Sequence, residues 1–232
     1  MKKLILCGRN TVMDAIQNNL PIDSIVVNSD SFAQKLKTKY KKINISIKDS
    51  TFFNEYKNDN HQGIIAILKD FPIFPLDQIY KDKPDNVLIL DHIQDPHNLG
   101  AIIRTANAFG IKHIVLTKDK SCDITSTVLK VSSGGFVNMK IIKVSNLVAT
   151  IKKMKEWNYW IYSSALNVNA KRFDSIEYNK PTCLIIGNEG NGVSLPVLKQ
   201  SDEIIYIPQK GTVQSLNVSV ASGLLIHQIT KD

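Results

Sequence analysis

The sequence predicts an α/β protein in which a small α/β unit precedes a larger domain built on a mostly parallel sheet. After residue 86, apolar runs of strand length alternate with helix-like segments, which is typical of a parallel sheet covered on both faces. Four shorter β-prone runs come before residue 70, and a proline-containing charged stretch separates the two groups. With 232 residues, 43% of them hydrophobic, the chain can form two such units, each with its own core.

The first unit is predicted over residues 1–70. Its four strand-like runs are separated by helical or polar stretches; they are LILCG (4–8), SIVVN (24–28), NISI (44–47) and GIIAIL (63–68). The residues that follow carry Pro72, Pro75 and Pro84 among charged side chains. Because proline interrupts regular structure, we expect a linker over residues 71–85.

The second unit is predicted over residues 86–232. Its strands are expected at five apolar runs: NVLILD (86–91), HIVLT (113–117), WIYSSA (160–165), TCLIIG (182–187) and EIIYIP (203–208). In open parallel sheets, ligands bind beyond the carboxyl ends of the strands. The loops that follow these runs are therefore where we look for a site.

The first such loop leads into a helix in LDHIQDPHNLGAIIRTANAFG, residues 90–110. Asn98 is the expected N-cap and Gly110 the expected stop signal. Apolar side chains at helical spacing predict the buried face; they are Leu99, Ile102, Ile103, Ala106 and Phe109. Arg104 falls roughly opposite this stripe, so its guanidinium is free either for solvent or for a partner.

The second loop, CLIIGNEGNGVSLPVLKQ, holds Gly187, Gly190 and Gly192 around the carboxylate of Glu189. The spacing is neither GxGxxG nor that of a phosphate-binding loop, which excludes both nucleotide motifs. Glycines still allow a tight turn or a close approach of backbone to a ligand. A binding loop is the favoured interpretation, and a plain strand-to-helix turn capped by Ser194 is the alternative.

The third loop lies in IPQKGTVQSLNVSVASGLLIHQI, residues 207–229. Ser215 is predicted to cap the helix that follows, whereas Asn217 falls inside the first turn, where a capping role explains it less well. The helix is apolar on nearly all sides. Burial in a subunit interface would account for this.

Composition limits the partner and the compartment. A formal charge of +8 and a pI near 9.3 favour an anionic partner such as nucleic acid. The three cysteines form no CxxC pair, so we expect no disulfide and no zinc site, as suits a reducing cytoplasm. The start, MKKLILCG, lacks the apolar length of an export signal, and no apolar run is long enough to cross a membrane. No metal site is expected, because Asp91, His92, Asp95 and His97 lack a metal-ligand spacing.

Three stretches, DPHNLGAIIRTANAFG, LIIGNEGNGVS and IPQKGTVQSLNVSVAS, resemble the three ordered motifs of the SpoU (TrmH-like) RNA 2′-O-ribose methyltransferases. The resemblance spans residues 88–229. The first unit, through GRNTVMDAI and HQGIIAI, is similar to the RNA-binding domain of the bacterial 23S ribosomal RNA guanosine-2′-O-methyltransferases, which is itself similar to ribosomal protein L30e. The stretch SSGG at 132–135 departs from the more usual Gly-Ala ending.

The resemblance implies a SPOUT domain with a deep trefoil knot, a homodimer joined through the knotted domains, and S-adenosylmethionine as methyl donor. The donor would be held largely by backbone around Gly187, Ile207 and Leu216. The catalytic residues that the resemblance implies are Asn98, Arg104, Glu189, Ser215 and Asn217. Arg104 would reach the donor bound by the partner subunit.

RNA contacts are expected in the first unit. The basic run KLKTKYKK offers Lys35, Lys37 and Lys39, with Tyr40 for base stacking, and Arg9 opens a helix. The resemblance makes a guanosine in 23S ribosomal RNA the expected target. Two alternatives are the same chemistry on tRNA or on another rRNA loop, and a non-catalytic RNA-binding protein of ribosome assembly.

Overall fold

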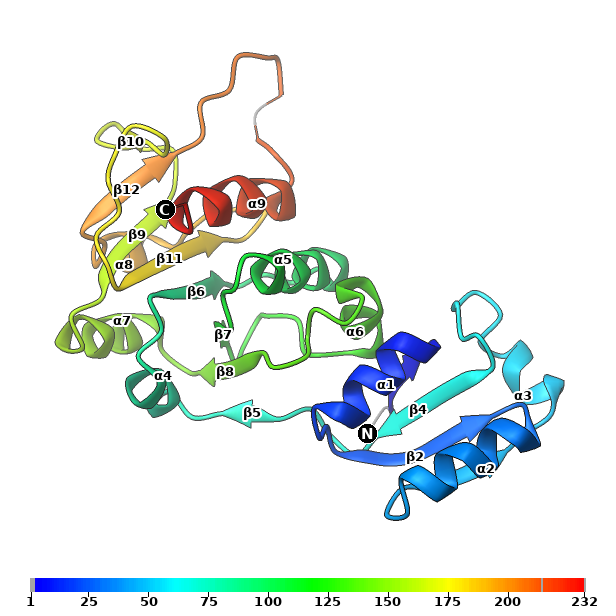
Figure 1. Ribbon diagram of the computed structural model, residues 1–232. Helices are drawn as coiled ribbons and strands as arrows, with labels where there is room; N and C mark the ends of the chain where they lie inside the picture. Colours follow the sequence, from blue (N-terminus) through cyan, green and yellow to red (C-terminus); the bar gives the residue numbers. More distant parts are fainter. Residues whose placement is uncertain (1–2, 214, 232) are drawn as a thin grey trace.

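The computed structural model describes residues 3–213 and 215–231 and shows two sheets with their helices (Figure 1). The smaller sheet has the strand order β1-β4-β2-β3, in which only the β2–β3 pair is parallel. Its elements are β1 (Leu4–Cys7), α1 (Arg9–Gln17), β2 (Ile22–Val27), α2 (Asp30–Lys39), β3 (Asn44–Ile47), α3 (Ser50–Asn54) and β4 (Ile64–Leu68).

The larger sheet has eight strands in the order β10-β12-β9-β11-β6-β7-β8-β5, and its pairings are parallel. The mostly parallel sheet predicted from the sequence is confirmed. Its elements are β5 (Ile73–Phe74), α4 (Asp77–Asp82), β6 (Asn86–Asp91), α5 (Pro96–Ala108), β7 (His113–Thr117), α6 (Ser126–Ser132), β8 (Lys140–Val144), α7 (Leu147–Glu156), β9 (Trp160–Ser164), β10 (Lys171–Arg172), β11 (Thr182–Gly187), α8 (Leu195–Leu198), β12 (Glu203–Tyr206) and α9 (Val218–Ile229).

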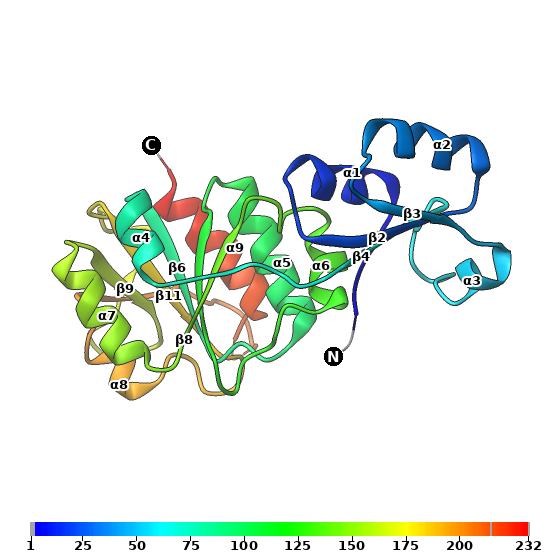
Figure 2. The same ribbon diagram turned by 90° about the horizontal axis from the view of Figure 1, so that it is seen from below.

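Helices cover both faces of the larger sheet, as Figure 2 shows. Side chains alternate along a strand, so β6 sends Leu88 and Leu90 to one face and Val87 and Ile89 to the other. The first face packs against α5, α6 and α9, and the second against α4, α7 and α8. Because both faces are buried, the strand is almost continuously apolar, which is the pattern that predicted it.

The stretch predicted as a linker contains regular structure. Strand β5 pairs with β8 at the edge of the larger sheet, and Ile79 of α4 is fully buried. The three prolines lie outside these elements: Pro72 precedes β5, Pro75 follows it, and Pro84 follows α4. They mark the ends of short elements, and residues 71–85 pack onto the larger sheet.

The small domain contacts α6 of the large one. The backbone N–H of Ile5 donates to Ser126 Oγ at 2.9 Å, and Lys130 Nζ lies 2.5 Å from Asp59 Oδ1. These contacts place β1 and the loop before β4 beside α6. A cleft between the two domains results.

Candidate active site at the carboxyl edge of the large sheet

Helix α5 begins at Pro96, three residues earlier than a cap at Asn98 would allow. The carboxylate of Asp95 accepts hydrogen bonds from the backbone N–H groups of His97 and Asn98, at 2.7 and 2.9 Å, and Pro96 occupies the first turn. The expectation that Asn98 caps the helix is therefore wrong. The Asp-Pro pair supplies the start signal, which leaves the Asn98 side chain available for other contacts.

Asn98 joins the three loops that the sequence singled out. Its Nδ2 donates to Glu189 Oε1 at 2.7 Å, and its Oδ1 accepts from Asn217 Nδ2 at 3.0 Å. Asn98 follows β6, Glu189 follows β11, and Asn217 comes after the loop that leaves β12. Because these strands are parallel, their carboxyl ends meet at one edge, and three residues distant in sequence form one hydrogen-bonded row.

Asn217 is itself the cap of α9. Its Oδ1 accepts from Ser219 N at 2.8 Å and from Ser219 Oγ at 2.6 Å, while its Nδ2 faces Asn98. The prediction that Ser215 caps this helix is wrong, because the helix begins two residues later than expected. Ser215 is exposed in the loop just before the cap.

The loop that carries Glu189 is held by hydrogen bonds to residues at the end of β6. Buried Asp91 accepts from Ser194 N at 2.8 Å, and Asn188 Nδ2 donates to the carbonyl of His92 at 3.0 Å. At Gly187 a Cβ atom would lie 2.0 Å from the backbone of Gly192. Glycine is required at 187 because the loop folds back directly over it, which holds Glu189 above the end of β11.

Arg104 lies apart from this row. It is exposed, its Nη1 donates to Ser133 Oγ at 3.4 Å, and among the described residues it forms no ion pair. Six residues separate it from Asn98 on one helix, which corresponds to about 9 Å along the axis and about 120° around it. Within one chain, the structure does not bring Arg104 to Asn98, Glu189 and Asn217.

The backbone near Arg104 is packed closely. A Cβ atom at Gly135 would lie 2.7 Å from Arg104 Cα, and one at Gly100 would lie 2.7 Å from Val131 Cβ. These glycines let α6 and the turn after it approach α5. Ser133, which sequence reasoning did not select, is brought to Arg104 by this packing, and only the unusual SSGG stretch pointed to it.

The residues expected near the methyl donor lie around the same edge. Gly187 ends β11 and is buried, Ile207 follows β12 and is half-buried, and Leu216 is half-buried one residue before the α9 cap. Half-buried apolar side chains beside backbone suit a flat heterocycle. S-Adenosylmethionine has no phosphate, so its fit to these residues requires no phosphate-binding loop.

The expected RNA contacts are distributed around the small domain. Lys35, Lys37 and Lys39 are exposed on α2, which lies away from α5 and α6 (Figure 1). Tyr40 is half-buried and packs against the core, with Lys39 Nζ 5.3 Å from its ring centre, so it is less accessible for base stacking than the sequence indicated. Arg9, at the start of α1, lies over the ring of Phe32.

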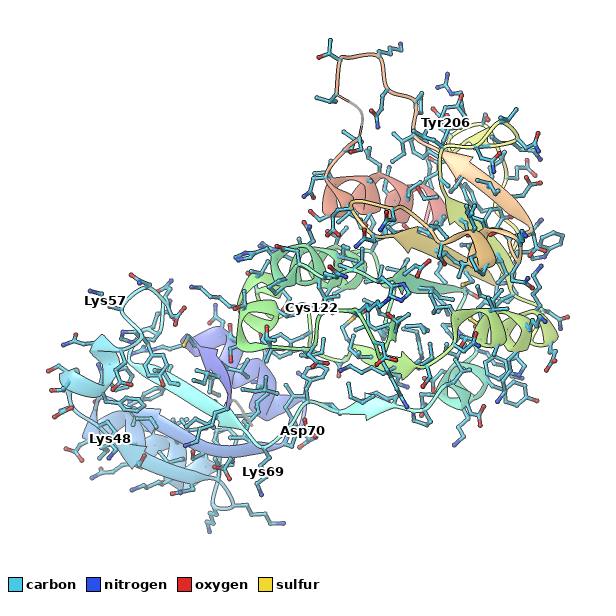
Figure 3. The ribbon with its side chains drawn as sticks, turned by 180° about the vertical axis from the view of Figure 1, so that it is seen from behind. Lys48, Lys57, Lys69, Asp70, Cys122 and Tyr206 are labelled. Atoms are coloured by element: carbon cyan, nitrogen blue, oxygen red, sulfur yellow. The ribbon has the colours of Figure 1, made fainter. Side chains whose placement is uncertain are left out.

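Further lysines surround the small domain on other sides. Lys48, Lys57 and Lys69 project from three different parts of it, as Figure 3 shows. The positive charge of this domain is therefore spread over its surface and does not mark a single RNA-binding face.

The expectation that no metal is bound concerned Asp91, His92, Asp95 and His97, and three of these four side chains have other partners. Asp91 and His92 pair with each other at 2.5 Å, and Asp95 caps α5. Over residues 3–213 and 215–231, no group of three His, Cys, Asp or Glu side chains is placed to hold a metal ion. None of the helices in those ranges has the length and apolarity needed to span a bilayer.

A parallel sheet with polar loops gathered at one carboxyl edge, next to a small α/β domain, defines the class of α/β proteins that bind a ligand beyond their strand ends. The family described as SpoU rRNA Methylase matches residues 85–227, and the family described as RNA 2′-O ribose methyltransferase substrate binding matches residues 5–73. The chain belongs to the SpoU family of RNA methyltransferases.

Relatives and solved structures agree with this. A protein of Staphylococcus aureus (strain COL), named as a member of the TrmH family of tRNA/rRNA methyltransferases, is 33% identical over 99% of this chain and 96% of its own length. The fold is similar to that of an rRNA methyltransferase from Sinorhizobium meliloti, with TM-score 0.84, 23% identity and coverage of 98% and 86% of the two chains. It is also similar to the SpoU methyltransferase AviRb from Streptomyces viridochromogenes in complex with AdoMet, with TM-score 0.84, 18% identity and coverage of 99% and 89%.

Proposed function

We propose that this protein transfers a methyl group from S-adenosylmethionine to the 2′-hydroxyl of a guanosine ribose in 23S ribosomal RNA. The observation that carries the proposal is the row Glu189–Asn98–Asn217, which joins the three motif loops at the carboxyl edge of the sheet. Each side-chain amide in the row uses its oxygen and its nitrogen at once. The row therefore holds the three loops in one arrangement.

S-Adenosylmethionine, when bound, supplies a methyl group carried on a positively charged sulfur. The protein has to orient the ribose hydroxyl in line with that methyl group and assist the loss of the hydroxyl proton. We assign the orientation to Asn98, Glu189, Ser215 and Asn217. Gly187, Ile207 and Leu216 are proposed to hold the donor at the ends of the neighbouring strands.

Arg104 is proposed to bind the phosphate next to the target ribose and to stabilise the developing alkoxide. Its guanidinium forms no ion pair among the described residues, so its donors are available for RNA. A guanidinium stays protonated in proteins and is therefore a poor base, which favours electrostatic stabilisation over proton removal.

The separation of Arg104 from the Asn98 row supports a homodimeric site. Exposed apolar side chains lie on α9, which packs against α5, and at the end of α5, the helix that carries Arg104; they are Phe109, Val220 and Leu224, at 42%, 53% and 41% exposure. We propose that two copies pack through this face, so that Arg104 of each reaches the row of the other. The apolar character of α9, noted in the sequence, is then explained by burial in the dimer.

We also propose that the loop at 207–217 takes part in a trefoil knot. The strand order supports this: β12 lies outside β9, yet the chain then returns to place α9 against α5 and β11. The chain must therefore pass back over the carboxyl edge of the sheet, where the Glu189 loop lies.

The RNA target is proposed from the whole chain. The domain proposed at residues 1–70, joined by 71–85 to the methyltransferase domain at 86–232, would bind the RNA through Arg9 and the basic α2 side chains. The similar solved structure that spans 98% of the chain is named as an rRNA methyltransferase. The Staphylococcus relative is named for tRNA and rRNA, so tRNA remains the second candidate target.

We place this activity in the cytoplasm. Cys7, Cys122 and Cys183 are free thiols, and Cys183 is fully buried in the sheet. Free cysteines persist in a reducing compartment.

The test is transfer of labelled methyl from S-adenosylmethionine to unmodified 23S rRNA and, separately, to unmodified tRNA, followed by mapping of the blocked 2′-hydroxyl. The proposal predicts one ribose-methylated guanosine in 23S rRNA. Labelling of tRNA alone would move the target and keep the chemistry. Donor binding without labelling of either RNA or of ribosomal precursors would support a non-catalytic assembly protein.

A further inference from the structure

The two domains enclose a cavity of about 680 Å³. The small domain contributes the end of β1, the start of α1 and the loop before β4, and the large domain contributes the start of α5 and one side of α6. Ligand cavities for small molecules have about 300–1,000 Å³, so one nucleotide can be accommodated. Nothing in the proposed methyl-transfer site uses this cavity.

Several polar side chains that line the cavity have no partner. The amides of Asn10 and Asn60 and the ring of His97 are exposed at the cavity and make no hydrogen bond with any other described residue, so a ligand can replace the solvent around them. The wall also contains the aromatic ring of Tyr56. Unpaired donors and acceptors beside an aromatic ring are the groups that bind an unstacked nucleobase.

The charge of the lysine that lines the cavity is balanced by a neighbouring aspartate. Lys130 is the only lysine among the described residues that line the cavity; it lies 2.5 Å from Asp59 and also donates to the carbonyl of Asn58 at 3.2 Å. The thiol of Cys7 stays protonated, because burial raises its pKa to about 11. A cavity with unpaired neutral polar groups and compensated charges suits a base better than a phosphate.

The cavity opens next to Arg104. Ser133, which accepts from Arg104 Nη1 at 3.4 Å, lies in its wall, and so does His97, the neighbour of Asn98 on α5. An RNA strand whose phosphate contacts Arg104 can therefore place an adjacent base in the cavity. The contacts of Ser126 and Lys130 with the small domain hold the two walls together.

We propose that this cavity binds one unstacked base of the RNA, next to the methylated nucleotide, and that Asn10 and Asn60 contact its edge. The inference rests on the proposed function for the identity of the ligand as RNA. It adds a base-reading site at the domain boundary, distinct from the basic side chains of α2.

The test measures binding of RNA hairpins that share one stem and a loop of uridines, in which one loop position carries guanosine, adenosine, cytidine or an abasic ribose. We expect the wild-type protein to bind its preferred loop about tenfold more tightly than the abasic loop, as one or two base-edge hydrogen bonds would give. Asn10→Ala and Asn60→Ala should each reduce this ratio to about threefold or less.

Asn44→Ala is the matched control, because Asn44 is an exposed asparagine of the same domain on β3, outside the cavity. It should keep the tenfold ratio. The inference would be overturned if the wild type and both cavity variants preferred the best loop over the abasic loop by the same factor, or if the wild type bound both loops equally. The dissociation constants require no methyl donor, so this result is separate from any failure of methyl transfer.

Discussion

Asn98 is the residue on which the proposed site depends most, because each end of its side-chain amide has a different partner. Asn98→Ala removes both hydrogen bonds and frees the Glu189 and Asn217 loops. We expect turnover to fall about 100-fold, since small misplacements of reacting groups cost that much. Donor affinity should change less than about threefold, because the donor is proposed to bind largely through backbone.

Both quantities are measured by steady-state methyl transfer and by calorimetric titration with S-adenosylmethionine. Asn107→Ala, at the other end of α5, is the control, because the Asn107 side chain donates to the carbonyl of Val137 and lies outside the row. Equal losses of turnover and donor affinity in Asn98→Ala would indicate a folding role for Asn98.

Substitution of Arg104 tests whether methyl transfer needs a planar cation at this position. Arg104→Lys keeps the charge and loses the fork of donors that can bind a phosphate oxygen and a developing alkoxide together. We expect kcat/KM to fall at least about tenfold. An Arg104→Lys enzyme with near-full turnover in the same assay would contradict the role given to the guanidinium.

At the scale of elements, helix α9 is capped by Asn217, whereas the sequence predicted Ser215 as its cap. Asn217→Ala should lower the free energy of unfolding by about 1 kcal/mol, because it removes an N-cap. Asn217→Asp keeps the capping oxygen and loses the donor to Asn98, so it should retain stability and lose activity. Ser215→Ala should leave stability unchanged in urea unfolding; a loss as large as that of Asn217→Ala would contradict the assigned cap.

Helix α4 is attached to the sheet by partly buried polar contacts of Asp82. His113 Nε2 lies 2.7 Å from Asp82 Oδ2, and Lys140 contacts the same carboxylate. Burial lowers the pKa of His113 despite Asp82. Burial raises the pKa of Asp82, but hydrogen bonds from Lys140, His113 and Gln78 outweigh it and lower this pKa to about 2.

These shifts predict loss of stability in acid. Below the pKa of an unfolded histidine, about 6.5, the unfolded chain binds a proton that His113 resists in the fold, so the free energy of unfolding falls as the pH drops from about 7 to 5. Asp82 stays charged in that range. Its contribution to the free energy of unfolding is lost only as the pH falls from about 4 to about 2. His113→Gln should flatten the slope between pH 7 and 5 in urea unfolding, and an unchanged slope in this variant would contradict the account.

The strands that the sequence predicted are those with long apolar runs. Strands β6, β7 and β11 begin and end where expected, because burial on both faces leaves few polar residues in them. Strand β8, with two isoleucines between lysines, and the two-residue β10 carry too weak a pattern and were not predicted. Phe109 was expected in the core of α5 and is 42% exposed, because the helix ends at Ala108.

At the scale of the whole molecule, the sequence identified the three loops but not how they meet. The pairing of Glu189, Asn98 and Asn217 depends on the strand order, which no local pattern encodes. The cavity between the domains was not foreseen for the same reason, since Asn10, Asn60 and His97 belong to no shared motif. The separation of Arg104 from the row could be recognised only once α5 and the loops were placed in space.

That separation leads to the central claim, that each active site combines Arg104 of one subunit with the Asn98 row of the other. The most direct measurement mixes Arg104→Ala and Asn98→Ala proteins, each inactive alone, and follows methyl transfer after subunit exchange. Random pairing makes about half of the dimers mixed, and each mixed dimer has one intact site of two, so the account predicts about a quarter of wild-type activity. If the mixture stays as inactive as its components while exchange is shown to occur, Arg104 and Asn98 act within one subunit and the claim is wrong.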